Sequence, residues 1–288
     1  MFVDYHIYLD ESYYNVNQLT KLLDNFNISK AIISPPCTKV TEPEKSDLMY
    51  FIQRKLLMNT IGFNFSKTIS KSFYNEKNEL RLFWKLFSGN KNLHKVMSPD
   101  NGLVYNLILN KEKFLMWYWI NPLLRDLAKD EYLLNKYSDK IFGIKFHQYW
   151  HNFNLKEIYK YESIIKKKKL KLYLLLNYQD EVHILNLVKK FNHTKIIFGY
   201  GGFPLFNRIW DLINANDNCF IDLTSNHIDI PIIKKIINKI KIEKIVFGSD
   251  CPYNFKNING EFDYNLLFQR LDFLKMNEKQ KILNNIIE

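Results

Sequence analysis

The 288-residue sequence contains little cysteine, and its few cysteines form no framework. Cys37, Cys219 and Cys251 are odd in number, lie far apart and include no Cys-x-x-Cys pair. Disulfide-stapled folds and structural zinc fingers depend on paired or closely spaced cysteines, so the sequence argues against both. This cysteine usage is typical of a reducing compartment, and we expect a cytoplasmic protein.

Long apolar runs are also missing. No segment reaches the roughly 18 consecutive apolar residues that a membrane-spanning helix needs. Residues 1–6 lack the basic start and the apolar core of a signal peptide. We therefore expect no membrane partner. The sequence is nevertheless 47% hydrophobic and 16% aromatic, which is enough for a large folded core.

Acidic residues are the minority among the charges. The chain has 30 Asp and Glu against 41 Lys and Arg, a formal net charge of +11. The lysines are spread over many segments, and the densest run, residues 166–169, ends a predicted helix, where cations interact favourably with the helix dipole. The charge indicates a solvated surface, and we expect no specific nucleic-acid partner.

Apolar runs of strand length alternate with segments whose apolar residues recur at helical spacing. This alternation predicts parallel strands joined by helical crossovers, and the simplest such fold is one (β/α)8 TIM barrel domain over residues 1–288. A doubly wound open sheet is the alternative, but no glycine-rich phosphate loop follows the first strand. Residues 61–112 show no firm period and are expected to form an insertion or lid-like excursion. The predicted strands are 2–9, 30–34, 114–120, 141–147, 172–177, 195–202, 219–223 and 244–247, and the predicted helices are 16–26, 42–58, 123–137, 155–169, 180–191, 205–215 and 229–240.

The last predicted strand is followed by a single acidic residue, Asp250. Residues 244–253 read Lys-Ile-Val-Phe-Gly-Ser-Asp-Cys-Pro-Tyr, an apolar run that stops at Gly248 and cannot continue its ladder through Pro252. Asp250 is thereby placed at the carboxyl end of the strand, where α/β barrels carry their chemistry. An isolated Ser-Asp pair can equally be a helix cap. Whether Asp250 is a cap or a catalytic acid therefore depends on the residues at the other strand ends.

Two other predicted strands place polar side chains on one face. Asp4, His6 and Tyr8 alternate along the first strand, and Lys145 and His147 alternate along the fourth. Because the carboxyl ends of barrel strands meet at one mouth, we expect these groups near Asp250.

Taken together, the strand ends resemble the amidohydrolase superfamily, in the amidohydrolase-related branch that includes aminocarboxymuconate-semialdehyde decarboxylase-like enzymes and small lactone hydrolases. The matching motifs occur in the same order and span nearly the whole chain. They are Asp4-Tyr5-His6-Ile7-Tyr8 for Asp-x-His-x-His, Asn121-Pro122 after the third strand, Gly143-Ile144-Lys145-Phe146-His147 for Gly-Ile-Lys-Leu-His, Phe247-Gly248-Ser249-Asp250-Cys251-Pro252 for Phe-Gly-Ser-Asp-x-Pro, and Lys281-Ile282-Leu283-Asn284-Asn285 in the last helix.

The resemblance implies one divalent ion at the mouth, held by histidines and activating a water molecule. The sequence departs from this pattern where ligand histidines are expected, with Tyr8 on the first strand, Asn177 after the fifth and Tyr200 after the sixth. Of the metal set, only His6 and Asp250 remain. Two ligands are few for a metal site, so we expect either no cofactor or one weakly held divalent ion, zinc or manganese.

These residues predict a divergent amidohydrolase-related hydrolase, or a decarboxylase-type lyase, for a small anionic or carbonyl-containing substrate. Asp250 is predicted to be the general base, with His6 and His147 as its catalytic companions. The predicted substrate-binding residues are Tyr8, Lys145, Asn177 and Tyr200. The alternative is a catalytically inactive barrel kept as a binding or regulatory protein. The resemblance also allows a homodimer.

Overall fold

The computed structural model describes residues 2–36, 99–124, 126–151, 153–177, 181–223, 228–253 and 255–287. The predicted helix at 42–58 and residues 61–98 of the predicted excursion lie outside these ranges. The rest of that excursion, residues 99–112, contains the helix α5 (Asn101–Ile108). Within the described ranges, no helix has the length and apolarity needed to cross a bilayer.

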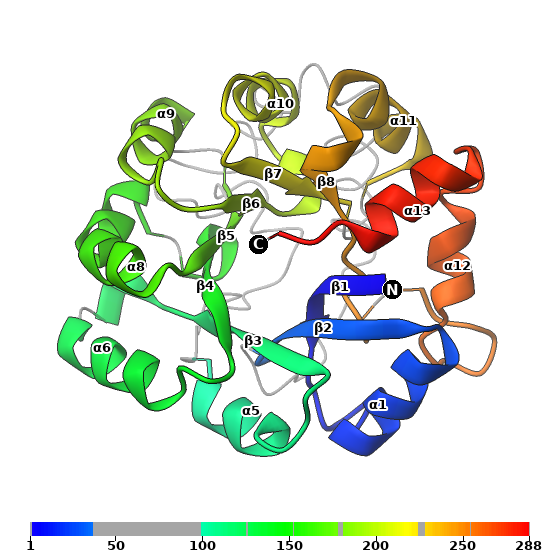
Figure 1. Cartoon of the computed structure of the whole chain (residues 1–288), viewed down its shortest axis with the longest axis horizontal. Helices are drawn as coiled ribbons and strands as arrows, with labels where there is room; N and C mark the ends of the chain where they lie inside the picture. Colours follow the sequence, from blue (N-terminus) through cyan, green and yellow to red (C-terminus); the bar gives the residue numbers. More distant parts are fainter. Residues whose placement is uncertain are drawn as a thin grey trace, which may run out of the picture.

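The strands form one eight-stranded sheet in the order β1 to β8, and each neighbouring pair is parallel. Figure 1 shows the strands at the centre of the molecule and the helices in a ring around them. The predicted TIM barrel is thus confirmed. The strands are β1 (Phe2–Tyr8), β2 (Ile28–Ser34), β3 (Phe114–Trp119), β4 (Ile141–His147), β5 (Lys171–Leu175), β6 (Ile196–Phe198), β7 (Cys219–Asp222) and β8 (Ile245–Val246).

The helices cover the outside of the sheet and follow the predicted order with local differences, and α7 and α12 lie where no helix was predicted. Pro122–Leu124 forms the short helix η2 before α6 begins at Leu127, and the predicted helix 155–169 divides into η3 and α8. The predicted strand 195–202 ends at Phe198, because Tyr200–Gly202 turns into η4. The helices are α1 (Val16–Asn25), α5, η2 (Pro122–Leu124), α6 (Leu127–Lys136), α7 (Gln148–His151), η3 (Leu155–Tyr161), α8 (Glu162–Lys168), α9 (Glu181–Lys190), η4, α10 (Phe206–Ala215), α11 (Ile230–Lys239), η5 (Ile242–Lys244), α12 (Tyr264–Gln269) and α13 (Met276–Asn284).

The barrel closes between β1 and the segment that follows β8. Tyr5 N donates to Phe247 O at 3.0 Å, Asp250 N donates to His6 O at 2.8 Å, and Tyr8 N donates to Cys251 O at 2.8 Å. These backbone hydrogen bonds continue past the short β8 and tie Asp250 directly to the His6 backbone. The closure therefore sets the position of the acid relative to the first strand.

Trp117 crosses the barrel interior and compensates for an irregularity in β1. The pairing of β1 with β2 is interrupted between Asp4 and Ile7, so the Tyr5 carbonyl lies outside the regular ladder. The Trp117 indole nitrogen donates to that carbonyl at 2.7 Å, and its ring packs against Phe142 and Tyr173. Because a buried carbonyl without a partner is costly, this one indole stabilises β1 just before His6.

Gly143 on β4 allows a close approach to the backbone of β5. A Cβ atom at this position would lie 2.4 Å from Lys171 O and 2.5 Å from the Trp117 ring. We expect Gly143→Ala to lower the free energy of unfolding by about 1–3 kcal/mol, because neither the β5 backbone nor the packed indole can move away without loss. Chemical denaturation of both proteins measures this difference.

Gly102→Ala is the matched control. Near the start of α5, its Cβ would meet two side-chain atoms and no backbone, the Tyr137 hydroxyl at 3.2 Å and Asp100 Oδ1 at 3.6 Å. Because alanine is the better helix former, this variant is expected to be at least as stable as the wild type. Equal stability of Gly143→Ala and the wild type would contradict the close packing described for β4.

Candidate active site

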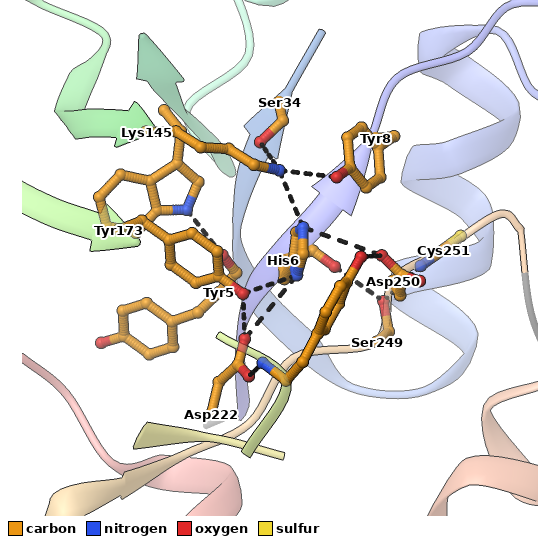
Figure 2. A network of polar contacts seen from close by, with 12 residues as sticks. Tyr5, His6, Tyr8, Ser34, Lys145, Tyr173, Asp222, Ser249, Asp250 and Cys251 are labelled. Atoms are coloured by element: carbon orange, nitrogen blue, oxygen red, sulfur yellow. Dashed lines mark hydrogen bonds and ion pairs between the residues drawn. The ribbon is translucent and has the colours of Figure 1, made fainter. Parts of the chain in front are cut away.

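A buried polar network fills the carboxyl-terminal end of the barrel, and His6 lies at its centre. Figure 2 shows the His6 ring between Lys145 on one side, Tyr173 and Asp222 on another, and Asp250 toward the loop after β8. These side chains come from five different strands or strand ends. The alternation of β1 points His6 inward, and the parallel pairing of β4, β5 and β7 brings the others to the same level.

The Nδ1 side of His6 is fixed by a tyrosine and a carboxylate. The Tyr173 hydroxyl lies 2.7 Å from His6 Nδ1 and donates its proton to Asp222 Oδ2. The other Asp222 oxygen accepts from the Tyr200 backbone N at 2.7 Å. Burial and the adjacent Asp222 raise the pKa of Tyr173, so the phenol keeps its proton. Since the phenol donates its one hydrogen bond to Asp222, it can only accept from His6, so the network assigns a hydrogen to Nδ1 of His6 and leaves Nε2 as an acceptor.

The Nε2 side of His6 faces the Lys145 amine. Lys145 Nζ lies 2.9 Å from His6 Nε2, 2.8 Å from the Tyr8 hydroxyl and 3.2 Å from Ser34 Oγ. It also lies over the Tyr8 and Trp119 rings, 4.1 and 4.7 Å from their centroids. An ammonium has three N–H donors, and three acceptors surround this one. Aromatic faces add cation–π attraction, so the site is built around a positive charge.

Asp250 is the outermost acid of the network. Its carboxylate lies 3.8 Å from His6 Nε2 and accepts from the Tyr200 hydroxyl at 3.3 Å. Asp250 keeps 5% of its surface exposed, whereas His6 and Lys145 are at 0%. Asp250 and Tyr200 both have left-handed backbones, with φ of 58° and 53°. This conformation is uncommon for residues other than glycine, and here it turns both residues toward His6.

Burial shifts the pKa of both Asp250 and His6. Burial raises the pKa of Asp250 to about 7, with Lys145 opposing the shift and Asp222 adding to it. Burial and the Lys145 charge lower the pKa of His6 to about 4. At neutral pH, His6 is therefore a neutral ring, while Asp250 exchanges its proton close to the working pH.

A third buried acid, Asp4, supports the backbone around His6 and Asp250. Asp4 accepts hydrogen bonds from His6 N and Ser249 N, each at 3.0 Å, and from the Tyr264 hydroxyl at 2.8 Å. These bonds join the irregular part of β1 to the turn after β8. Burial raises the pKa of Asp4 to about 6 despite these donors. Asp4 therefore fixes the backbone on which His6 and Asp250 are mounted.

An aromatic layer lies beside Lys145. The Trp119 ring stacks on His147 with centroids 5.6 Å apart, and His151 packs against the same indole at 5.6 Å. Burial lowers the pKa of both histidines, so both rings are neutral at pH 7. Trp119 Nε1 is buried and has no hydrogen-bond acceptor among the described residues. This layer offers planar surfaces and one N–H donor next to the cation.

Searches of family models and of curated proteins found no match. Among solved structures, the chain is similar to a probable 2-pyrone-4,6-dicarboxylic acid hydrolase from Acinetobacter baumannii with citric acid bound, with 12% identity, a TM-score of 0.61 and coverage of 98% of this chain and 96% of that one. The fold is that of the amidohydrolase barrels.

Two further solved structures extend the likeness. An amidohydrolase from Burkholderia multivorans with bound zinc has 10% identity, a TM-score of 0.58 and coverage of 99% and 96%. A dihydroxybenzoic acid decarboxylase from Polaromonas sp. JS666 with bound manganese and 2-nitroresorcinol has 12% identity, a TM-score of 0.53 and coverage of 98% and 94%. At such identities the likeness establishes the fold, as the sequence motifs predicted.

The side chains present do not fit the metal site that the amidohydrolase barrels imply. Among the described residues, no three His, Cys, Asp or Glu side chains converge to hold a metal ion. The nitrogen of His6 that would ligate a metal instead accepts from Lys145. Tyr8, in the position of the second histidine, also accepts from that amine. The donor set is therefore that of an ammonium site.

The structure brings most of the predicted site residues together. His6, Asp250, Tyr8, Lys145 and Tyr200 all belong to the network around His6. His147 lies in the adjacent aromatic layer. Asn177 is buried past the end of β5, where its backbone N donates to Gln148 at 3.1 Å.

Sequence reasoning missed Tyr173, Asp222 and Ser34. Asp222 carried a usable signal, because a carboxylate in the last position of a buried strand, Cys219–Asp222, requires a partner. Tyr173 gave a weaker signal, since a tyrosine inside an apolar strand is usually read as packing.

Proposed function

We propose that the protein is a hydrolase or decarboxylase-type lyase of the amidohydrolase kind, acting on a small anionic carbonyl compound with Asp250 as the general base. The observation that carries this proposal is the placement of Asp250, a carboxylate with its pKa raised to about 7, at the outer edge of a network that holds a buried lysine. A base is most effective when its pKa lies near the working pH.

The geometry supports a different role for each of the site residues. Ionised Asp250 takes a proton from water as the water attacks the substrate carbonyl, and the Tyr200 hydroxyl holds the carboxylate in place. The Lys145 charge attracts the anionic group of the substrate and stabilises negative charge that develops on the carbonyl oxygen. Neutral His6 keeps the lysine oriented through its Nε2 atom. In a decarboxylation, protonated Asp250 would return a proton to the carbon that loses carbon dioxide.

The names of the similar barrels support the substrate class. The Acinetobacter protein is named for a pyrone dicarboxylic acid and the Polaromonas protein for a dihydroxybenzoic acid. Both compounds are small, planar and carboxylated. A buried lysine beside aromatic rings suits such substrates, because the charge binds a carboxylate and the rings pack against a planar body.

An activity screen on protein treated with a chelator tests the proposal. The panel consists of lactones, amides and aromatic carboxylic acids, assayed for hydrolysis and for carbon dioxide release. We expect turnover of at least one carboxylated member after metal removal. Absence of turnover across the panel would reject the enzyme proposal in this form.

The pH dependence of that activity is expected to rise with pH through about 7. Burial raises the pKa of Asp250 to about 7, so the carboxyl is protonated and inactive as a base below this value and ionised above it. The kcat/KM for hydrolysis, measured from pH 5 to 9, checks this limb because it reports ionisations of the free enzyme. A hydrolysis rate that falls as pH rises through 7 would contradict the base role.

A second candidate function is favoured by the replaced ligand positions. Tyr8, Asn177 and Tyr200 stand where the amidohydrolase pattern has histidines. Loss of several ligands together suits a barrel that binds a small anion without converting it. Saturable binding of a panel compound without product would support this function over catalysis.

A further inference from the structure

The Lys145 ammonium lies where the amidohydrolase pattern places its divalent ion. The donors of that pattern at the first strand and after the last strand correspond to positions 6, 8 and 250. Lys145 Nζ lies 2.9 Å from His6 Nε2 and 2.8 Å from the Tyr8 hydroxyl, and its charge acts on Asp250. The side chains that would converge on a metal converge here on an amine.

We propose that Lys145 is the resident cation of this site, replacing a metal ion as the positive charge that receives an oxygen of the substrate. This assignment deepens the proposed function and rests on it for its catalytic meaning. The occupant it predicts for the mouth of the barrel is a small planar carboxylate that carries a neighbouring carbonyl oxygen.

The surrounding network holds the ammonium in place. Asp222 accepts a hydrogen bond from the Tyr173 hydroxyl, Tyr173 accepts from His6 Nδ1, and His6 Nε2 accepts from Lys145. Each bond fixes the next, so the His6 lone pair is committed to the amine. Lys145 is fully buried, and rotating it away would break its hydrogen bonds to His6, Tyr8 and Ser34 and its cation–π contacts with the neighbouring aromatic rings. A divalent ion on His6 Nε2 would meet this like charge at contact distance and is excluded.

Because the Lys145 ammonium carries one positive charge where a divalent ion carries two, another residue has to activate the water molecule. An ammonium does not lower the pKa of a bound water as a divalent ion does, so water needs a separate base. Asp250 is available for that role, because it is the acid nearest the surface and burial raises its pKa to about 7. The cation and the base are thus two neighbouring side chains.

Two donors define the ligand class. Of the three acceptors around Lys145, Ser34 Oγ is the most distant, at 3.2 Å, so a substrate oxygen would replace it most easily. The Trp119 ring lies 4.7 Å from the same amine, and its Nε1 has no acceptor among the described residues. A carboxylate with an adjacent carbonyl supplies one oxygen for each donor.

Metal content tests the assignment without any activity assay. Wild type, Tyr8→His, Lys145→Ala and the double variant are stripped with chelator and titrated with zinc. The double variant combines three ligands, from positions 6, 8 and 250, and removes the ammonium. We expect it to bind one zinc ion at least about 100-fold more tightly than the wild type or Tyr8→His. Tight zinc binding by the wild type, or equal binding by Tyr8→His and the double variant, would overturn the proposal.

Oxalate binding is a second test that keeps the proposal falsifiable if the double variant does not fold. Oxalate is planar and has adjacent carbonyl oxygens, and calorimetry follows its binding to the metal-free protein. We expect Lys145→Met, which keeps the chain length and removes the charge, to bind at least about tenfold more weakly than the wild type. The surface control Lys190→Met is expected to match the wild type. Equal binding by Lys145→Met, or no oxalate binding by the wild type, would overturn the proposal.

The two proposals can fail separately. If the protein excludes zinc and binds oxalate through Lys145 but converts no panel compound, the resident-cation proposal stands and the enzyme proposal is rejected. If the protein hydrolyses a panel substrate only with tightly bound zinc, it is an enzyme and the resident-cation proposal is rejected.

Discussion

Asp250→Asn is expected to lower kcat/KM for the best hydrolysed substrate by about 10²–10⁴-fold, the usual contribution of a positioned general base. The change keeps the size of the side chain and an oxygen that can accept from the Tyr200 hydroxyl. It removes the negative charge and with it the ability to take a proton. Because burial of the Asp250 charge is itself unfavourable, the variant is expected to fold at least as stably as the wild type.

Asp10→Asn is the matched control for this experiment. Asp10 is also a buried acid near the mouth, but its carboxylate accepts from Ser12 and Tyr253 and makes no described contact with His6 or Lys145. Its kcat/KM is expected to stay within about threefold of the wild type. An Asp250→Asn protein that keeps more than about a tenth of the activity would remove Asp250 from the role of base.

Trp117→Ala is expected to lower the free energy of unfolding by about 3–5 kcal/mol, the range for deleting a fully buried large aromatic side chain. Trp117 has no exposed surface and fills the barrel between Phe142 and Tyr173. Its loss also leaves the Tyr5 carbonyl without the indole donor. Urea denaturation followed by circular dichroism measures the change.

Trp117→Phe separates the two contributions. Phenylalanine retains much of the packing and lacks the N–H group, so its expected cost is about 1–3 kcal/mol, that of an unsatisfied buried acceptor. A Trp117→Ala protein within about 1 kcal/mol of the wild type would show that the interior collapses around the missing ring, contrary to the rigid packing inferred here.

The barrel could be predicted from the sequence because its strands are short apolar runs with sharp ends. The run 141–147 matches β4 residue for residue, and 114–120 matches β3 to within one residue. The prediction was weaker where strands are very short. The run 195–202 continued past Phe198, because the left-handed turn at Tyr200 leaves no mark in the hydrophobic pattern.

The site was predictable in its residue types and only partly in its arrangement. Alternation on β1 and β4 gives the inward direction of His6 and Lys145, and the motif after β8 marks Asp250. Tyr173 and Asp222 were missed because their role depends on contacts across the barrel, between β1, β5 and β7. The position of Lys145 on His6 Nε2 also depends on the barrel diameter, which no local pattern encodes.

The left-handed backbones of Tyr200 and Asp250 bear on how this chain has been selected. A side-chain-bearing residue in this conformation is less favourable than glycine by about 1–2 kcal/mol. Glycine at either position would relieve that cost, and a barrel selected only to stay folded would gain by the exchange. The chain instead carries a tyrosine and an aspartate, the two side chains that meet at the mouth. The chain thus accepts this backbone cost at the two positions that present a phenol and a carboxylate beside His6, as the proposed function requires.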